Sequence, residues 1–146
     1  MKEMLALAKE AVEAAKVWKL DLDYSAESLE GLEWLAEKIF RSNRLFSLPE
    51  DILVSMANVY GAYLGVVLLR SGLADLDFAW VKNEEGEIGV GKEDFLMYPV
   101  TKFYKRITRG PEHNLTDFFE CMFGLAIGAV DLNDPRMHML SEKEVS

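Results

Sequence analysis

The sequence predicts an α+β domain in which about five helices pack on a small antiparallel sheet. Apolar residues recur at helical spacing in several long segments, and two short apolar runs flank the turn sequence NEEG. Half of the 146 residues are hydrophobic, which is enough to build one core. We expect a single domain over residues 1–130, followed by a flexible C-terminal tail over 131–146, where the composition turns polar.

The first third of the chain predicts two amphipathic helices with a short extended segment between them. Residues 3–17 carry apolar side chains at helical spacing. Residues 18–24 alternate between apolar and charged side chains, a pattern that indicates an extended segment. Ser25 is the expected N-cap of a second helix over 26 to about 41, because its hydroxyl can accept a backbone N–H of the first turn.

The most apolar stretch predicts a buried central helix over about 50–70. The sequence SLPE at 47–50 has the pattern of a capping box, with Ser47 as the cap and Glu50 reaching back to it. Residues 52–69 carry no charge, and this length is close to that of a membrane span. Polar side chains and glycines within the stretch, and the lack of a basic flank, favour a core helix over a membrane helix.

Glycines at a spacing of four residues occur in two helical segments. Gly61 and Gly65 lie in the central helix, and Gly124 and Gly128 lie in the last one. Glycine costs about 1 kcal/mol relative to alanine inside a helix, so such pairs usually permit a close approach by a neighbour. The sequence therefore predicts that these two helices cross each other at their glycines.

The second half of the chain predicts a hairpin and two helices. The hairpin covers 78–91 with its turn at 83–86, and 95–98 is a candidate third strand. A short helix follows over 100–109 and ends at Gly110-Pro111. Asn114 is the expected cap of the last helix.

The helix over 100–109 has a basic face in an otherwise acidic protein. The formal net charge is −9, yet no acidic residue occurs over 95–111. The four cations fall at helical spacing, and they are Lys102, Lys105, Arg106 and Arg109. Three interpretations remain open: a solvated face, internal pairing with the glutamates over 27–37, or the binding of an acidic ligand.

The ligand interpretation predicts an anion or carboxylate pocket at the 106–116 loop. Arg106 and Arg109 lie in the last turn of the basic helix, and the N-terminus of the next helix opens nearby. His113 could join them, although Glu112 and Asp117 could occupy the same donors. Tyr98 is a further candidate to line the cleft. The candidate binding residues are Arg106, Arg109, His113, Lys102, Lys105 and Trp80.

No arrangement of residue types in the sequence indicates catalysis. Cys121 and His113 are the one conceivable Cys–His pair, and their separation of eight residues keeps them apart on a single helix. Cys121 lies in an apolar run and is expected to be a buried, inert thiol. We predict no catalytic residue, no metal site and no cofactor, so an enzyme is the less favoured class.

Charge and cysteine content limit the cellular compartment and the classes of partner that we expect. The N-terminal segment lacks the apolar region of a signal peptide, and a single cysteine suits a reducing compartment, so a cytoplasmic protein is expected. The acidic balance disfavours nucleic acid as a partner, and no membrane association is expected. A protein partner is predicted, with an anionic small molecule as the alternative. The sequence predicts no particular oligomeric state.

Several short motifs occur in an order that resembles a family of small uncharacterised bacterial proteins. Two of them are LDYSAESLEGL at 22–32 and YGAYLGVVLLR at 60–70, and a strand DFAWV containing Trp80 follows. The resemblance covers roughly residues 20–125 and ends with a phrase made of Pro99, Lys102, Lys105, Arg106 and Gly110. Val66 departs from the family pattern, where glutamate is more usual, and LADLDF replaces a glycine-glycine turn before the strand.

The resemblance implies a binding role rather than a reaction. The family has no assigned activity, and its members are similar in size and acidity to the immunity partners of secreted toxins. We therefore expect a non-enzymatic binding protein that acts through a protein surface, with an immunity-like role as one form of it. The alternative is a small ligand-binding protein or enzyme that recognises an anionic group at the 106–116 loop.

Overall fold

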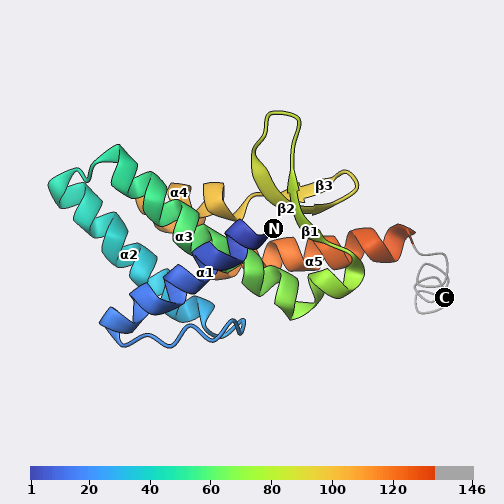
Figure 1. Cartoon of the computed structure of the whole chain (residues 1–146), viewed down its shortest axis with the longest axis horizontal. Coiled ribbons are helices and arrows are strands. Elements are labelled where there is room, and N and C mark those ends of the chain that lie inside the picture. Colours follow the sequence, from blue (N-terminus) through green and yellow to red (C-terminus); the bar gives the residue numbers. More distant parts are fainter. Residues whose placement is uncertain (134–146) are drawn as a thin grey trace.

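The computed structural model describes residues 1–133, with side chains as far as residue 128, and confirms the predicted α+β class. Five helices pack on a three-stranded antiparallel sheet (Figure 1). The helices are α1 (Lys2–Ala15), α2 (Leu29–Phe46), α3 (Glu50–Leu68), α4 (Pro99–Arg109) and α5 (Leu115–Asn133). Residues 134–146 of the predicted tail lie outside the described residues, and α5 includes the first three residues of that predicted tail.

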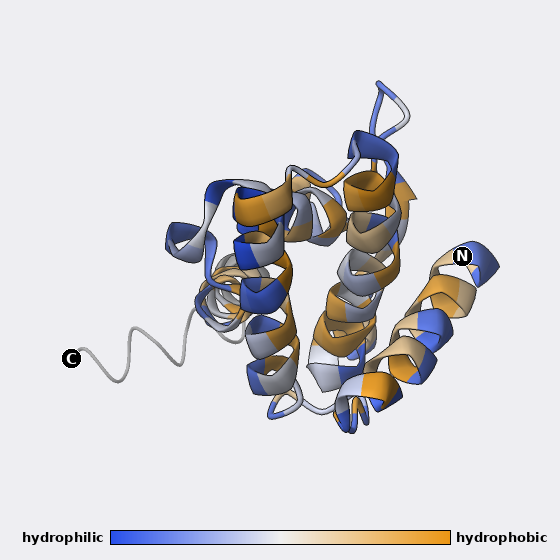
Figure 2. Ribbon diagram, turned by 90° about the vertical axis from the view of Figure 1, so that its left-hand side faces the viewer, coloured by the Kyte–Doolittle hydropathy of each residue, from blue (hydrophilic) through white to orange (hydrophobic). Residues whose placement is uncertain are grey.

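Helix α3 is the centre of the core, as its composition predicts. Residues 60–68 are all buried, because α1 packs along one flank of α3 and α4 along the other. The face of α1 toward the core is small, and it consists of Met4, Ala8, Ala11 and Ala15. In Figure 2, α1 and α2 carry both blue and orange residues, which is the mixed hydropathy of amphipathic helices.

The glycines of α3 contact α4 and the sheet, so the predicted crossing with the last helix is wrong. A Cβ atom on Gly61 would lie 2.4 Å from the Cα atom of Val100 in α4. A Cβ atom on Gly65 would lie 2.1 Å from the Trp80 ring. Cβ atoms on Gly124 and Gly128 would meet no described atom within 4 Å. The close approach therefore occurs between α3 and two elements, helix α4 at Gly61 and strand β1 at Gly65.

The sheet matches the predicted hairpin and third strand. Strands β1 (Ala79–Lys82), β2 (Ile88–Lys92) and β3 (Phe95–Met97) pair in the order β1-β2-β3. Asn83 fixes the turn, because its Oδ1 accepts the backbone N–H groups of Glu85 and Glu87 at 2.9 and 2.8 Å. The cross-strand neighbours Trp80, Val90 and Met97 are buried and form the sheet's contribution to the core.

Two local predictions are corrected. Ser47 does not cap α3, since it adopts a left-handed conformation (φ 50°) and ends α2, while Asn43 binds the backbone N–H groups of Ser47 and Leu48. The predicted extended segment 18–24 is not a strand: Trp18 ends a 3-10 turn, and residues 20–23, of which Leu22 is buried, join no sheet. The Ser25 hydroxyl does accept the Ser28 N–H at 3.2 Å, although the helix itself begins at Leu29.

One helical stretch of the described residues, Glu50–Leu76, is long and apolar enough to cross a membrane by length and composition. Its most apolar 18-residue window is 61% buried inside the protein. Packing of α1 and α4 against this helix accounts for that burial. The helix thus has the contacts of a core helix, in agreement with the interpretation of the sequence.

Candidate functional site

Arg106 of the basic helix is buried and paired within the chain. Its side chain is 2% exposed, although the helical spacing placed it beside Lys102 and Arg109 on a solvent face. The guanidinium donates to both carboxylate oxygens of Glu33, through Nε at 3.0 and 2.9 Å and through Nη2 at 2.7 Å. Nη2 also donates to Glu37 at 2.7 Å. Of the three interpretations of the basic face, internal pairing with glutamates of the 27–37 segment is therefore the correct one for Arg106.

The charges in this cluster stabilise each other. Hydrogen bonds from Arg106, and then from Arg41, lower the pKa of Glu37 below its ordinary value. Burial disfavours the charged guanidinium of Arg106, but the hydrogen bonds to Glu33 and Glu37 outweigh it and raise its pKa. Glu37 and Arg106 are thus both ionised near neutral pH. Glu30, another glutamate of the 27–37 segment, forms no ion pair within the described residues.

The helix N-terminus that the ligand interpretation required is also occupied. Oε1 of Glu33 accepts the backbone N–H of Leu115, the first residue of α5, at 3.0 Å. Asn114 caps the same turn, because its Oδ1 accepts the N–H of Asp117 at 3.0 Å. Any external anion that used Arg106 and this helix end would have to displace a carboxylate of the protein itself.

Lys102, one turn before Arg106 on α4, forms a second pair with His113. Lys102 Nζ lies 3.2 Å from His113 Nδ1 and 5.6 Å from the centre of the Phe118 ring. Burial, followed by the charge of Lys102, lowers the pKa of His113. Burial, followed by the charge of Lys105, lowers the pKa of Lys102. The neutral imidazole is thus favoured, with Nδ1 as the acceptor of the lysine.

Replacing Lys102 with methionine is expected to raise the pKa of His113 back toward its ordinary value, because the nearby charge is removed while the burial remains. In the parent, the depressed folded pKa means that the unfolded state binds more protons. The contribution of His113 to stability is therefore present above its unfolded pKa and is lost as the pH falls through the folded one. NMR titration of the imidazole measures the shift, with Lys9→Met in α1 as the control. An unchanged titration would contradict the pairing.

The remaining predicted binding residues are dispersed. Arg109 is exposed and Lys105 is partly exposed, and neither forms an ion pair within the described residues. Trp80 is 9% exposed beneath Gly65 and Pro99, and Tyr98 accepts a hydrogen bond from Asn83. The structure therefore brings Lys102 and His113 together, places Arg106 in an internal cluster and sets Trp80 in the core. A binding role for Arg109 and Lys105 stays a prediction.

The motif LDYS holds a loop against the core helix. The buried hydroxyl of Tyr63 accepts the N–H of Tyr24 at 2.8 Å and lies 2.6 Å from Ser28 Oγ. The Tyr24 ring stacks on Tyr63 with centroids 5.2 Å apart, and the Arg70 guanidinium lies 4.1 Å from the centre of the Tyr24 ring. Burial raises the pKa of Tyr63, so this hydroxyl stays protonated. The motif thus has a structural role.

The predicted burial of Cys121 is wrong. Its side chain is exposed, because the outer face of α5 is not covered by other parts of the described chain. The described residues contain no group of three or more His, Cys, Asp or Glu side chains that could hold a metal ion.

An exposed aromatic patch was missed by the analysis of the sequence. It consists of Val17, Trp18 and Trp34, whose exposed fractions are 81%, 50% and 43%. The two indole rings meet edge to face with centroids 6.1 Å apart, and Lys38 Nζ lies 5.1 Å from the centre of the Trp34 ring. Trp34 lies one turn after Glu30 and one turn before Lys38, so it belongs to the polar face of α2. This spacing is the signal in the sequence that indicates its exposure. We call these three residues the Trp18–Trp34 patch.

Comparison of the chain with protein-family models, with curated proteins and with solved structures found no match. The resemblance to the bacterial family therefore stays a prediction, and the function is argued from the site alone.

Proposed function

We propose that the protein is a non-enzymatic binding protein that acts through a protein surface, and that the Trp18–Trp34 patch is this surface. The observation that carries the proposal is the exposure of two neighbouring tryptophans, 50% and 43%, beside an almost fully exposed valine. Large apolar side chains that gather on a surface mark sites of interaction, whereas single exposed ones are common.

Tryptophan is among the residues that contribute most to protein–protein binding. The two rings of the patch come from different segments, Trp18 from the turn after α1 and Trp34 from α2. Their edge-to-face contact restrains each ring, so less side-chain entropy is lost when a partner covers them. The patch is therefore organised before binding.

The state of the basic cluster supports a protein surface over an anion pocket. Glu33 and Glu37 bind Nε and Nη2 of Arg106, and Glu33 occupies the N-terminus of α5. Nη1 of Arg106 is buried and has no hydrogen-bond partner among the described residues. The anion alternative would rest on Lys102, Lys105 and Arg109, none of which forms an ion pair within the described residues. An immunity-like role in the cytoplasm is one form of the proposal, in which the bound partner is a toxin that the protein blocks.

Replacing Trp18 and Trp34 with alanine together is expected to weaken partner binding at least about thirtyfold, the factor that corresponds to about 2 kcal/mol, which a single hot-spot tryptophan typically contributes. Partners are captured from native lysate on the parent protein and identified, and the affinity of the purified partner is then measured for each variant. An immunity-like role predicts in addition that the partner is toxic when expressed alone and harmless when expressed with the parent.

The matched control is Leu45→Ala with Phe46→Ala, which removes two other apolar side chains, each 76% exposed, at the far end of α2. This control should bind as the parent does. Equal binding by the tryptophan variant, with its fold intact by circular dichroism, would exclude the patch as the binding surface.

A further inference from the structure

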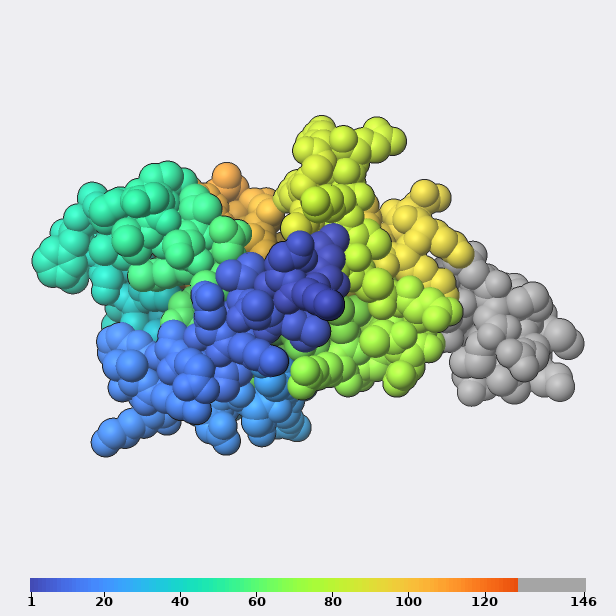
Figure 3. Space-filling view, in the orientation of Figure 1, coloured from blue at the N-terminus to red at the C-terminus, as the bar shows by residue number. Residues whose placement is uncertain are grey.

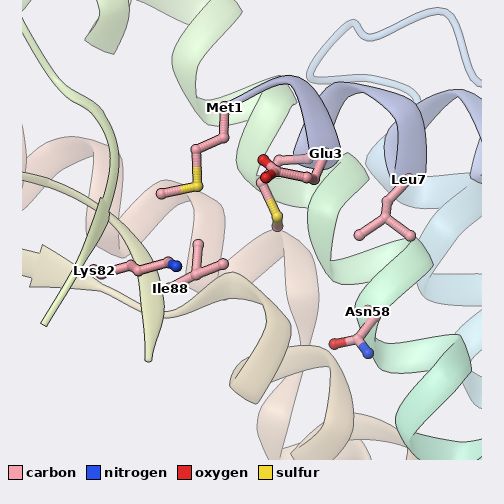
Figure 4. A pocket seen from close by; sticks show the side chains of 7 residues that line it. Met1, Glu3, Leu7, Asn58, Lys82 and Ile88 are labelled. Carbon is pink, nitrogen blue, oxygen red and sulfur yellow. The ribbon is translucent and has the colours of Figure 1, made fainter. Parts of the chain in front are cut away.

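A pocket opens between the start of α1, the middle of α3 and the β1–β2 hairpin. Its volume is about 490 Å³, which lies in the range of small-molecule sites. The apolar lining comes from Met1, Met4, Leu7 and Ile88. In Figure 4, Lys82 and Ile88 of the hairpin lie on one side of the pocket, and Leu7 and Asn58 lie on the other. In Figure 3, α1 lies across the front of the molecule, and the hairpin projects above it.

Three polar side chains surround this apolar lining, one from each neighbouring element. They are Glu3 of α1, Asn58 of α3 and Lys82 of β1. None of them forms a side-chain hydrogen bond or an ion pair with another residue of the described chain, in contrast to Arg106, which is paired with Glu33 and Glu37. One carboxylate, one ammonium and one amide are therefore available to a ligand.

We propose that this pocket binds a small zwitterionic molecule with an apolar body, of the kind represented by an amino acid with a large apolar side chain. The ammonium of such a ligand is placed at Glu3 and its carboxylate at Lys82, while Asn58 can donate to one group and accept from the other. The apolar body packs on Leu7 and Ile88.

Charge balance decides between ligand classes. A ligand with a single charge would be attracted by one of Glu3 and Lys82 and repelled by the other, whereas a zwitterion matches both. An uncharged apolar ligand would leave both charges facing its surface without a partner. Met1 and Met4 add adaptability, because unbranched thioether side chains adjust to ligands of different shape.

The pocket is distinct from the Trp18–Trp34 patch, and its proposed role does not depend on that patch. The pocket takes residues from the first two turns of α1, and Trp18 follows the other end of the helix. A helix of 14 residues is about 20 Å long, so a small ligand in the pocket cannot also reach the patch. A protein partner and a small ligand could then be bound at the same time.

Calorimetric titration with leucine, methionine and phenylalanine tests the site, with N-acetyl-leucine and leucinamide as ligands that lack one charge each. Binding at millimolar concentration is expected for the free amino acids. Glu3→Gln should weaken leucine binding about fivefold but should not weaken N-acetyl-leucine binding, because that ligand has no ammonium and its carboxylate is repelled by Glu3. Lys82→Gln should weaken leucine binding by about the same factor but should not weaken leucinamide binding, because that ligand has no carboxylate and its ammonium is repelled by Lys82.

Glu10→Gln is the matched control, since it removes an exposed carboxylate of α1 outside the pocket and should change no affinity. Ile88→Trp fills the pocket and should abolish binding while the circular dichroism spectrum is retained. No binding of any of the amino acids to the parent would overturn the proposal. Equal loss for charged and charge-deleted ligands in Glu3→Gln or Lys82→Gln would overturn the assignment of the two contacts.

Discussion

Replacing Glu33 with alanine is expected to lower the free energy of unfolding by about 3–5 kcal/mol, the typical result when one partner of a buried ion pair is removed. Arg106 would remain buried with Glu37 as its one acceptor, and the Leu115 N–H would lose its acceptor as well. Urea denaturation followed by circular dichroism measures the loss. A change below about 1 kcal/mol would show that the cluster is hydrated and weak.

Glu30→Ala is the control for this loss. Glu30 lies one turn before Glu33 on α2, is exposed and forms no ion pair within the described residues, so its removal should change stability by less than about 0.5 kcal/mol. Combining Glu33→Ala with Arg106→Ala should be less damaging than the sum of the two, because each substitution already removes the same interaction. Additive losses would contradict a direct pairing.

Replacing Gly61 with alanine is expected to destabilise the fold by about 1–3 kcal/mol, although alanine is the better helix former. The added methyl group would lie 2.4 Å from the Val100 Cα atom, so α4 would have to move away from α3. The obstacle is backbone, which cannot rotate out of the way as the end of a side chain can. Chemical denaturation measures the change.

The same substitution at Gly124 should have the opposite sign. A Cβ atom there would meet no described atom within 4 Å, so alanine should stabilise α5 by about 0.5–1 kcal/mol through helix propensity alone. Two glycines at the same spacing pattern thus give opposite results. Stabilisation by Gly61→Ala would contradict the tight contact between α3 and α4.

Elements that depend on neighbours in sequence could be predicted. The hairpin follows from the turn residues around Asn83, and the Asn114 cap follows from its own side chain. The capping box at Ser47 failed because the connection between α2 and α3 has only three residues. Within so short a loop, the same serine can end one helix or begin the next. Here Asn43, in the last turn of α2, accepts the Leu48 N–H with its side chain, and this contact holds Ser47 at the end of α2.

Contacts between distant segments could not be predicted from spacing. Helical periodicity placed Arg106 with the other cations, yet a long side chain next to Phe103 and Ile107 can be buried if a carboxylate is available. Its partner Glu33 is 73 residues away in the chain. Four glutamates lie on one stripe of α2, and their spacing does not indicate which of them pairs with Arg106. For the same reason, the spacing of the two glycine pairs does not indicate which segments pack against them.

The shared carboxylate of Glu33 also couples two parts of the fold. Its Oε1 accepts from the Arg106 side chain and from the first N–H of α5, so α5 cannot detach without weakening the interface between α2 and α4. Proteins open locally in cooperative units, and an otherwise lightly covered terminal helix would usually be such a unit by itself. We therefore expect the start of α5 to unfold together with the core, and local unfolding to be confined to the part of the helix beyond this anchor.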